Sequence, residues 1–353
     1  MTDERKAYYW LHTSGLSPRR MYALLDIYGK PSEIIKGLDS DKLREFCGGA
    51  YENMARRADE ELITEELRAI GRRGLRLLVR GYGNYPEKLS ACEEFPPLVL
   101  YAEGNDELLG RPSLAVVGSR ACTDYGRRVA TEWAEELSAS FVIVSGHATG
   151  IDGYAVKSAL AAGGCAICVL ACGHDAFERP EYMKDAGNRL LLVGAYPPDR
   201  KANKFVYHER NRVISGISDG VLVVEAGEKS GALITATAAA EQGKPLFAVP
   251  GSVLSTRSAG TNGLLRGGAV AATSPSDIFE DMGLDAPARK RYAEPTGRYA
   301  AVAEILRCGD AHFDTVAEKL GMSAGDTAEL LGEMEMEGLV ERKMMNYYSL
   351  LVR

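Results

Sequence analysis

Short apolar runs alternate with amphipathic segments through the middle of the chain. Residues 114–117 and 141–144 are apolar and rich in β-branched side chains, a pattern typical of strands buried on both faces of a parallel sheet. Between them, Val129, Trp133 and Leu137 recur at helical spacing, with charged residues on the other side. Each apolar run ends in a turn of small residues. The pattern predicts a strand–helix–strand unit around which the rest of the core is organised.

The same alternation continues towards the C-terminus. Helices are expected over 151–160 and 230–242, a long loop over 196–211, and further strands over 166–171, 190–193, 220–224 and 246–249. Repeated strand–helix units of this size predict an α/β core, a doubly wound parallel sheet with helices on both faces. In such sheets, ligands bind where the carboxyl ends of the strands meet.

Other segments flank this core. Residues 1–80 are expected to form a small helical domain whose 11–17 turn half-resembles a helix-hairpin-helix, and packing is favoured over DNA contact as its role. The core then occupies 81–283. Residues 284–297 contain prolines, glycine and mixed charge and are expected to be a linker. Residues 298–353 are expected to be a winged-helix-like module with a wing at 339–342 and 347–350.

Composition narrows the class of protein. With 46% hydrophobic and 26% charged residues, the 353-residue chain has the composition of a soluble globular protein. No apolar run approaches the roughly 20 residues of a membrane span, the charged N-terminus lacks a signal-peptide pattern, and seven cysteines without a small-domain framework fit a reducing cytoplasm. A cytoplasmic protein without membrane contact is expected.

The net charge of −7 argues against a protein that coats duplex DNA along a basic face. It leaves room for a local basic groove, because screening confines the field of a charge to about 10 Å at ~0.1 M salt.

Several forms of chemistry lack their motifs. The turn at residues 118–122 does not have the G-x-G-x-x-G spacing of dinucleotide-binding folds, and 227–231 only superficially suggests a P-loop. Without a G-x-S-x-G elbow, nucleophilic serine catalysis has no support. Neither a cofactor nor catalytic residues are predicted.

Cysteine and histidine do not form a convincing metal motif either. Cys165 and Cys168 would point to opposite faces of a strand, and buried cysteine behaves as a small apolar residue. His147, His174 and His208 are all expected in loops at strand ends, but no paired carboxylates accompany them.

What remains is an anion pocket. Backbone amides freed by glycine, hydroxyl groups and arginines follow successive predicted strands, and such groups favour a phosphate. Asn211 and Asn262 could fix loops or bind polar edges, and Tyr207 lies nearby to stack a base. The candidate residues are Gly118, Ser119, Arg120, Ser145, Gly146, Gly150, Asp152, Arg210, Asn211, Arg212, Ser230, Gly231, Thr235, Thr261 and Asn262.

These runs resemble the DNA-processing protein family (DprA, also called Smf). The matching runs are Val116-Val117-Gly118-Ser119-Arg120, Ser145-Gly146-His147-Ala148-Thr149-Gly150-Ile151-Asp152, Arg210-Asn211-Arg212-Val213-Ile214-Ser215-Gly216, Val223-Val224-Glu225-Ala226, Ser230-Gly231-Ala232-Leu233-Ile234-Thr235-Ala236, Phe247-Ala248-Val249-Pro250-Gly251 and Gly260-Thr261-Asn262. Tyr207-His208-Glu209 departs from the phenylalanine-proline run usual before Arg-Asn-Arg. The resemblance implies a Rossmann-like core that binds and protects incoming single-stranded DNA, forms homodimers and loads RecA recombinase in natural transformation, without catalysis.

The C-terminal module has a charge of its own. Residues 298–353 contain six Lys/Arg and ten Asp/Glu, and the expected recognition helix, 323–337, contains five acids and no base. Such a surface repels duplex phosphates. A protein-contact or regulatory role is therefore predicted for it.

Two alternatives remain open. A nucleotide-cleaving hydrolase of the cytokinin-activating (LOG) type shares this kind of core but needs a catalytic carboxylate after the glycine turn, where this chain has Ala232-Leu233-Ile234-Thr235. A nucleotide-sensing regulator with a protein-binding tail is the other.

Overall fold

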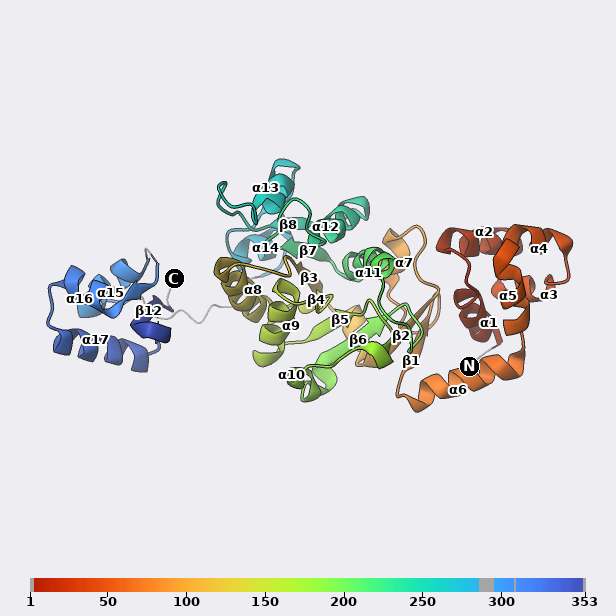
Figure 1. Cartoon of the computed structure of the whole chain (residues 1–353), viewed down its shortest axis with the longest axis horizontal. Helices are drawn as coiled ribbons and strands as arrows, with labels where there is room; N and C mark the ends of the chain where they lie inside the picture. Colours follow the sequence, from red (N-terminus) through yellow and green to blue (C-terminus); the bar gives the residue numbers. More distant parts are fainter. Residues whose placement is uncertain (1–2, 286–294, 308, 352–353) are drawn as a thin grey trace. The chain divides into compact units, whose positions relative to one another are not determined.

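A computed structural model describes residues 3–285, 295–307 and 309–351. The chain divides into two compact units, residues up to 285 and the residues that follow, and Figure 1 labels their elements. Most of the linker expected over 284–297 lies outside the described residues.

The first unit is built on one nine-stranded sheet with the order β1-β2-β6-β5-β4-β3-β7-β8-β9. Its strands are β1 (Arg76–Val79), β2 (Val99–Gly104), β3 (Ser113–Val117), β4 (Val142–Ser145), β5 (Ala166–Val169), β6 (Leu190–Gly194), β7 (Gly220–Val223), β8 (Leu246–Ala248) and β9 (Val270–Ala271). Strands β3 to β9 are parallel, which confirms the predicted Rossmann-like core. The sheet as a whole is mixed, because β2 pairs antiparallel with both β1 and β6.

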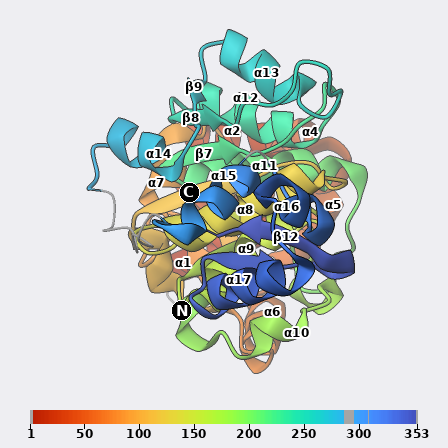
Figure 2. The same cartoon turned by 90° about the vertical axis from the view of Figure 1, so that its left-hand side faces the viewer.

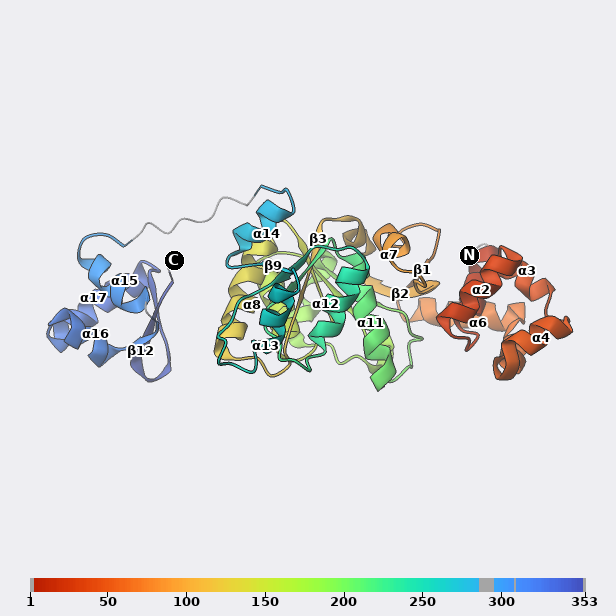
Figure 3. The same ribbon diagram turned by 90° about the horizontal axis from the view of Figure 1, so that it is seen from above.

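Helices cover both faces of the parallel strands (Figure 3). Leu114 and Val116 of β3 pack in a cluster with α8, α9 and α14, whereas Ala115 and Val117 pack in a cluster with α7, α11 and α12. Because alternate residues of a strand point to opposite faces, burial on both sides produces the continuous apolar run seen in the sequence. The helices of this core are α7 (Glu87–Cys92), α8 (Asp124–Leu137), α9 (Ile151–Ala161), α10 (Glu181–Lys184), α11 (Lys204–Ile217), α12 (Ala232–Glu241), α13 (Ala259–Arg266) and α14 (Pro275–Asp281).

Helix α11 differs from the sequence-based expectation, which places a loop over 196–211. The helix begins at Lys204 and buries Val206, Val213, Ile214 and Ile217. These apolar positions recur at helical spacing, but the polar run 208–212 between them hides the period. Arg210 and Asn211 therefore project from a helix and are not held on a loop.

The N-terminal helices form their own apolar cluster, which continues into the sheet. Trp10, Leu24 and Met54 belong to the same buried cluster as Val99 and Tyr101 of β2. Residues 76–79, which the sequence assigns to the helical segment, form the edge strand β1. The helices are α1 (Asp3–His12), α2 (Pro18–Tyr28), α3 (Pro31–Lys36), α4 (Asp41–Cys47), α5 (Tyr51–Arg57) and α6 (Glu60–Arg72).

The second unit is a winged helix, as predicted (blue in Figures 1 and 2). It contains α15 (Arg298–Arg307), β10 (Ala311–His312), α16 (Phe313–Leu320), α17 (Ala324–Met336), β11 (Val340–Arg342) and β12 (Tyr347–Leu350). Strand β12 pairs with both β10 and β11, and the wing joins β11 to β12. Along the described ranges of the chain, every helix is too short or too polar to span a bilayer.

His12 joins α1 to the sheet. Its Nε2 donates to the carbonyl oxygen of Ala195 at 2.8 Å, and its half-buried side chain lies beside the Tyr101 ring. Burial lowers the pKa of His12 to about 4, although the Ala195 carbonyl favours the protonated form. The folded protein therefore holds this imidazole neutral in a pH range where the unfolded chain protonates it.

A pH-dependent stability follows from this histidine. Below pH ~6.5 the unfolded chain binds a proton that the folded chain does not, so stability decreases as the pH falls towards 4. Between pH 7 and pH 5 we expect the free energy of unfolding, measured with urea, to fall by about 2 kcal/mol more in the wild type than in His12→Gln. His208→Gln, a substitution at an exposed position of α11, is the control. Its free energy of unfolding should change with pH as that of the wild type does. If the free energy of unfolding changes equally with pH in the wild type and in His12→Gln, the folded protein does not hold His12 neutral in this pH range.

Candidate functional site

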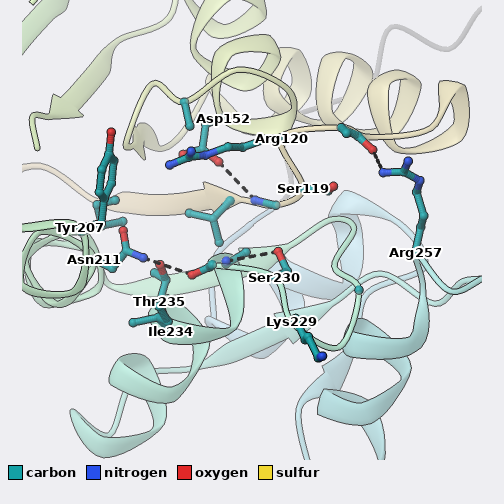
Figure 4. Close-up of a pocket in the computed structure, with 18 of the residues that line it drawn as sticks. Ser119, Arg120, Asp152, Tyr207, Asn211, Lys229, Ser230, Ile234, Thr235 and Arg257 are labelled. Atoms are coloured by element: carbon teal, nitrogen blue, oxygen red, sulfur yellow. Dashed lines mark hydrogen bonds between the residues drawn. The ribbon is translucent and has the colours of Figure 1, made fainter. Parts of the chain in front are cut away.

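A cavity of about 630 Å³ opens at the carboxyl ends of the parallel strands. It lies where β3 separates β4 on one side from β7 on the other, the point at which the strand order reverses. Its walls come from the loops after β3, β7 and β8 and from helices α9, α11 and α12 (Figure 4). Nine of the predicted residues line it: Gly118, Ser119, Arg120, Asp152, Arg210, Asn211, Ser230, Gly231 and Thr235.

The buried carboxylate of Asp152 connects the first two strand ends. Its Oδ1 accepts a hydrogen bond from the Gly118 amide and its Oδ2 one from the Gly146 amide, both at 3.2 Å. Burial raises the pKa of Asp152, whereas Arg210 and the two amides favour its ionised form. Both glycine amides, which the sequence suggests as anion ligands, are therefore already engaged within the protein.

The remaining residues of these turns brace the same arrangement. Ser145 Oγ donates to the Val116 carbonyl at 2.7 Å. Gly150 has φ +89°, and a Cβ there would overlap the carbonyl oxygen of Ser119. The Ile151 amide donates to that oxygen, at the start of α9. Ser145, Gly146 and Gly150 therefore position the cavity wall and do not line it.

Arg210 forms the base of the cavity on the α11 side. Its side chain is buried, its Nη1 donates to the Val169 carbonyl at 3.1 Å, and it packs so closely over Gly146 that a Cβ at that glycine would overlap it. Its Nε is buried and has no hydrogen-bond partner among the described residues. Burial lowers the pKa of Arg210, and Asp152 opposes that shift.

An aromatic ring completes this side of the cavity. The guanidinium carbon of Arg120 lies 5.1 Å from the centre of the Tyr207 ring and that of Arg210 lies 5.6 Å from it. Such distances suit cation–π contact. Tyr207 is half-buried and lines the cavity together with both arginines. Figure 4 labels Tyr207 and Arg120.

The opposite wall is tied to α11 by a side-chain amide. Asn211 Nδ2 donates to the Gly231 carbonyl at 3.1 Å, and Ser230 Oγ accepts from the Ala232 amide at the start of α12. Thr235 follows on α12 and is buried.

Three predicted residues lie away from the cavity. Arg212 points to another side of α11, where its Nε lies 3.0 Å from both carboxylate oxygens of Glu93 and its Nη1 lies 2.5 Å from Glu241. Thr261 is buried on α13, and Asn262 binds the backbone of Gly251. Arg212 and Arg210 therefore do not line the same cavity, because residues two apart on a helix face different directions.

Other residues of the site were not singled out from the sequence. Lys229 and Arg257 line the cavity, and Arg257 Nη1 donates to the Ala121 carbonyl. Glu225 is buried after β7 and accepts from the amide and hydroxyl of Thr123, which fixes the loop after β3. Cations in loops after predicted strands were the available signal for Lys229 and Arg257. A buried acid such as Glu225 gives no such signal.

The cysteines and histidines do not converge on the cavity. Cys168 is buried on β5, where burial raises its pKa to about 12. His147 contacts the Tyr182 hydroxyl, whereas His208 is exposed on α11. Within the part of the chain that the structure describes, no three His, Cys, Asp or Glu residues are arranged to hold a metal ion.

Fold and cavity together define a Rossmann-like protein with a cationic site at the strand-order reversal and a winged helix after it. Residues 76–283 match the family model of DNA recombination-mediator protein A, and residues 285–343 match the DprA winged helix domain. The chain is 38% identical over 272 residues to Protein Smf of Escherichia coli, which covers 72% of each chain. The chain therefore belongs to the DNA recombination-mediator protein A (DprA/Smf) family.

Two solved structures agree with this assignment. DprA from Streptococcus pneumoniae superposes with a TM-score of 0.66 at 31% identity, over 80% of this chain and 99% of that one. DprA from Helicobacter pylori, described in terms of its unique single-stranded DNA binding mode, has a TM-score of 0.52 at 30% identity, over 59% of this chain and 95% of that one.

The hydrogen bonds of Asp152 and its charge beside Arg210 predict that removing this charge strongly lowers the stability of the folded protein. Asp152→Asn leaves Arg210 buried without its counter-ion, so we expect the free energy of unfolding to fall by about 3 kcal/mol. Urea unfolding followed by tryptophan fluorescence measures this, since Trp133 lies on α8 of the same unit. Asp124→Asn, at an exposed carboxylate, is the control and should stay within ~0.5 kcal/mol of the wild type. Equal stability of both variants would show that the interactions of the Asp152 carboxylate are not important for stability.

Proposed function

We propose that this chain binds single-stranded DNA in the cavity between β3 and β7. The observation that carries the proposal is Tyr207 beside Arg120 and Arg210 at the wall of a concave, cationic site. An arginine holds a phosphate, and an aromatic ring stacks a base that is not enclosed in a duplex. The single-stranded DNA binding mode described for the H. pylori relative supports the same ligand.

The charge of the cavity favours a polyanion although the whole chain is acidic. Arg120, Arg210, Lys229 and Arg257 line it, and among the described lining residues Asp152 is the one carboxylate. Asp152 already interacts with Arg210 and with two amides. Beyond about 10 Å at ~0.1 M salt the acidic residues elsewhere contribute little.

The proposed role is binding without bond cleavage. Both oxygens of Asp152 accept hydrogen bonds from backbone amides, so this carboxylate is poorly placed to act as a general base. Thr235 occupies the region where a nucleotide hydrolase would need an acid. Nucleotide cleavage and nucleotide sensing therefore have less support than DNA binding.

The wider role is proposed on the family relationship. Members of the DprA family are expected to protect incoming single strands and to load RecA during natural transformation, and we propose the same for this chain, acting as a homodimer. A cytoplasmic location is part of this proposal.

Arg120 provides the direct test of DNA binding. We expect Arg120→Ala to weaken the binding of oligothymidine about tenfold or more. The plot of log affinity against log salt should flatten by about 0.7 for each phosphate that the variant no longer binds. Filter binding over a salt series measures both quantities, and a nucleoside monophosphate incubated with the protein should be recovered intact.

Arg68→Ala, at an exposed position on α6, is the matched control and should bind as the wild type does. If Arg120→Ala has the affinity and salt dependence of the wild type, Arg120 is not part of the site. If the wild type ignores oligothymidine at low salt, or cleaves the mononucleotide, the proposed function is wrong.

The winged helix generates a separate expectation about duplex DNA. Asp326, Glu329, Glu335 and Glu337 are exposed on or just after α17, the helix that such modules commonly place in the major groove. In that position these carboxylates would repel the phosphates of duplex DNA. We propose a protein-contact or regulatory role for this unit.

Removal of residues 286–353 should therefore leave duplex affinity unchanged or slightly higher. Gel shifts at moderate salt with the full chain and the shortened chain would measure this, and oligothymidine binding by both chains serves as the control for folding. A marked loss of duplex binding in the shortened chain would show that the winged helix binds DNA.

A further inference from the structure

The loop between β8 and α13 exposes two adjacent apolar side chains. Val253 is 89% exposed and Leu254 is 92% exposed. Single exposed apolar residues are common on protein surfaces. Two exposed neighbours in a loop that also contributes Thr256 and Arg257 to the cavity wall form a small apolar patch, and such patches mark contact sites.

Hydrogen bonds anchor this loop, residues 250–258, at several points. Asn262 Nδ2 donates to the Gly251 carbonyl at 3.0 Å, and the Gly251 amide donates back to Asn262 Oδ1 at 3.2 Å. The Tyr125 hydroxyl donates to the Pro250 carbonyl at 3.0 Å. Near the tip, the amides of Ser255 and Ser258 donate to the carbonyls of Ser252 and Ser255. The apolar tip is therefore presented by a braced loop.

The loop lies between two hollows. Thr256 and Arg257 form part of the wall of the main cavity, and in Figure 4 Arg257 lies at the opposite end from Tyr207. The other side of the loop borders a second hollow of about 570 Å³, which is rich in hydroxyl groups and is lined by Thr123, Tyr125, Pro250, Gly251, Ser252, Ser255 and Ser258. Tyr125 is half exposed there.

We infer that loop 250–258 and Tyr125 form a second contact site for the same unpaired DNA strand, which leaves the main cavity past Arg257. This inference rests on the proposed function. The planes of unpaired bases are apolar and pack against Val253, Leu254 or the Tyr125 ring, and the hydroxyl groups of the second hollow suit sugar and phosphate oxygens. Arg257 lines the main cavity and belongs to the same loop as Ser252 and Ser255 of the second hollow, so it supplies a cation for the connecting phosphate.

The second site makes a different contribution from the first. Interactions of Val253 and Leu254 are non-ionic, so removing them should lower affinity without changing the salt dependence. They should also matter only for a strand long enough to reach from the main cavity to the loop. An unchanged salt dependence and an effect confined to long strands therefore distinguish the contribution of the loop to binding from that of Arg120.

The test is the double variant Val253→Ser/Leu254→Ser. Fluorescence anisotropy is measured with labelled oligothymidines of about 4 and about 16 nucleotides, the span of site sizes common for single-strand binders. We expect the longer oligothymidine to bind roughly fivefold more weakly to the variant, with the wild-type salt slope, and the shorter one to bind equally to both proteins. Both side chains are exposed, so the variant should fold.

Ile27→Ser is the matched control, because Ile27 is an apolar residue on α2 with 67% exposure, and it should bind both oligonucleotides as the wild type does. Equal affinity of the double variant and the wild type for the longer oligothymidine would overturn the inference while leaving the proposed function intact. A changed molecular mass in solution, or loss of binding to anionic lipid vesicles, with DNA affinity unchanged would overturn it in favour of a second copy of the chain or of a membrane. A wild type that binds neither oligothymidine would overturn the proposed function itself.

Discussion

The geometry of the site depends on one buried carboxylate. Asp152 sits at the start of α9 and accepts hydrogen bonds from the amides at the ends of β3 and β4, next to the Arg210 guanidinium. Burying a charge is costly unless it is paired and hydrogen-bonded, and this arrangement provides both. Removing any one partner would leave a buried charge without its pair or its hydrogen bonds. The interactions of Asp152 therefore fix the positions of the turns after β3 and β4, of α9 and of α11 relative to one another.

This dependence explains why glycine stands where it does. A side chain at residue 146 would collide with Arg210, and one at residue 150 would collide with the backbone of the loop after β3. From the sequence alone, the same glycines suggest free amides for a phosphate. In the structure the amides of Gly118 and Gly146 bind Asp152, so the charge available to a ligand comes mainly from side chains, foremost Arg120.

The parallel core and most of the cavity were predictable because they follow local rules. Strands buried on both faces are apolar throughout, and parallel strands bring their carboxyl ends to one edge. The helix over Arg210 was missed because polar residues interrupt its apolar period, and with it the opposite orientation of Arg212. The direction of β2 was not predictable, since periodicity gives the faces of a strand but not its pairing. Glu225 acts through contacts with the distant loop after β3, which no local sequence pattern contains.

In the proposed function, preference for an unpaired strand arises from two opposed effects. Specificity is a difference between affinities, and it can come from attraction to one ligand or from repulsion of another. The Tyr207 ring, which lies beside Arg120 and Arg210, favours a ligand whose base faces are free, which a duplex does not offer. The acidic residues of α17 add repulsion against the dense phosphates of a duplex. An overall negative charge is therefore compatible with DNA binding, because it lowers non-specific duplex affinity while the cations that hold the strand are concentrated in one cavity.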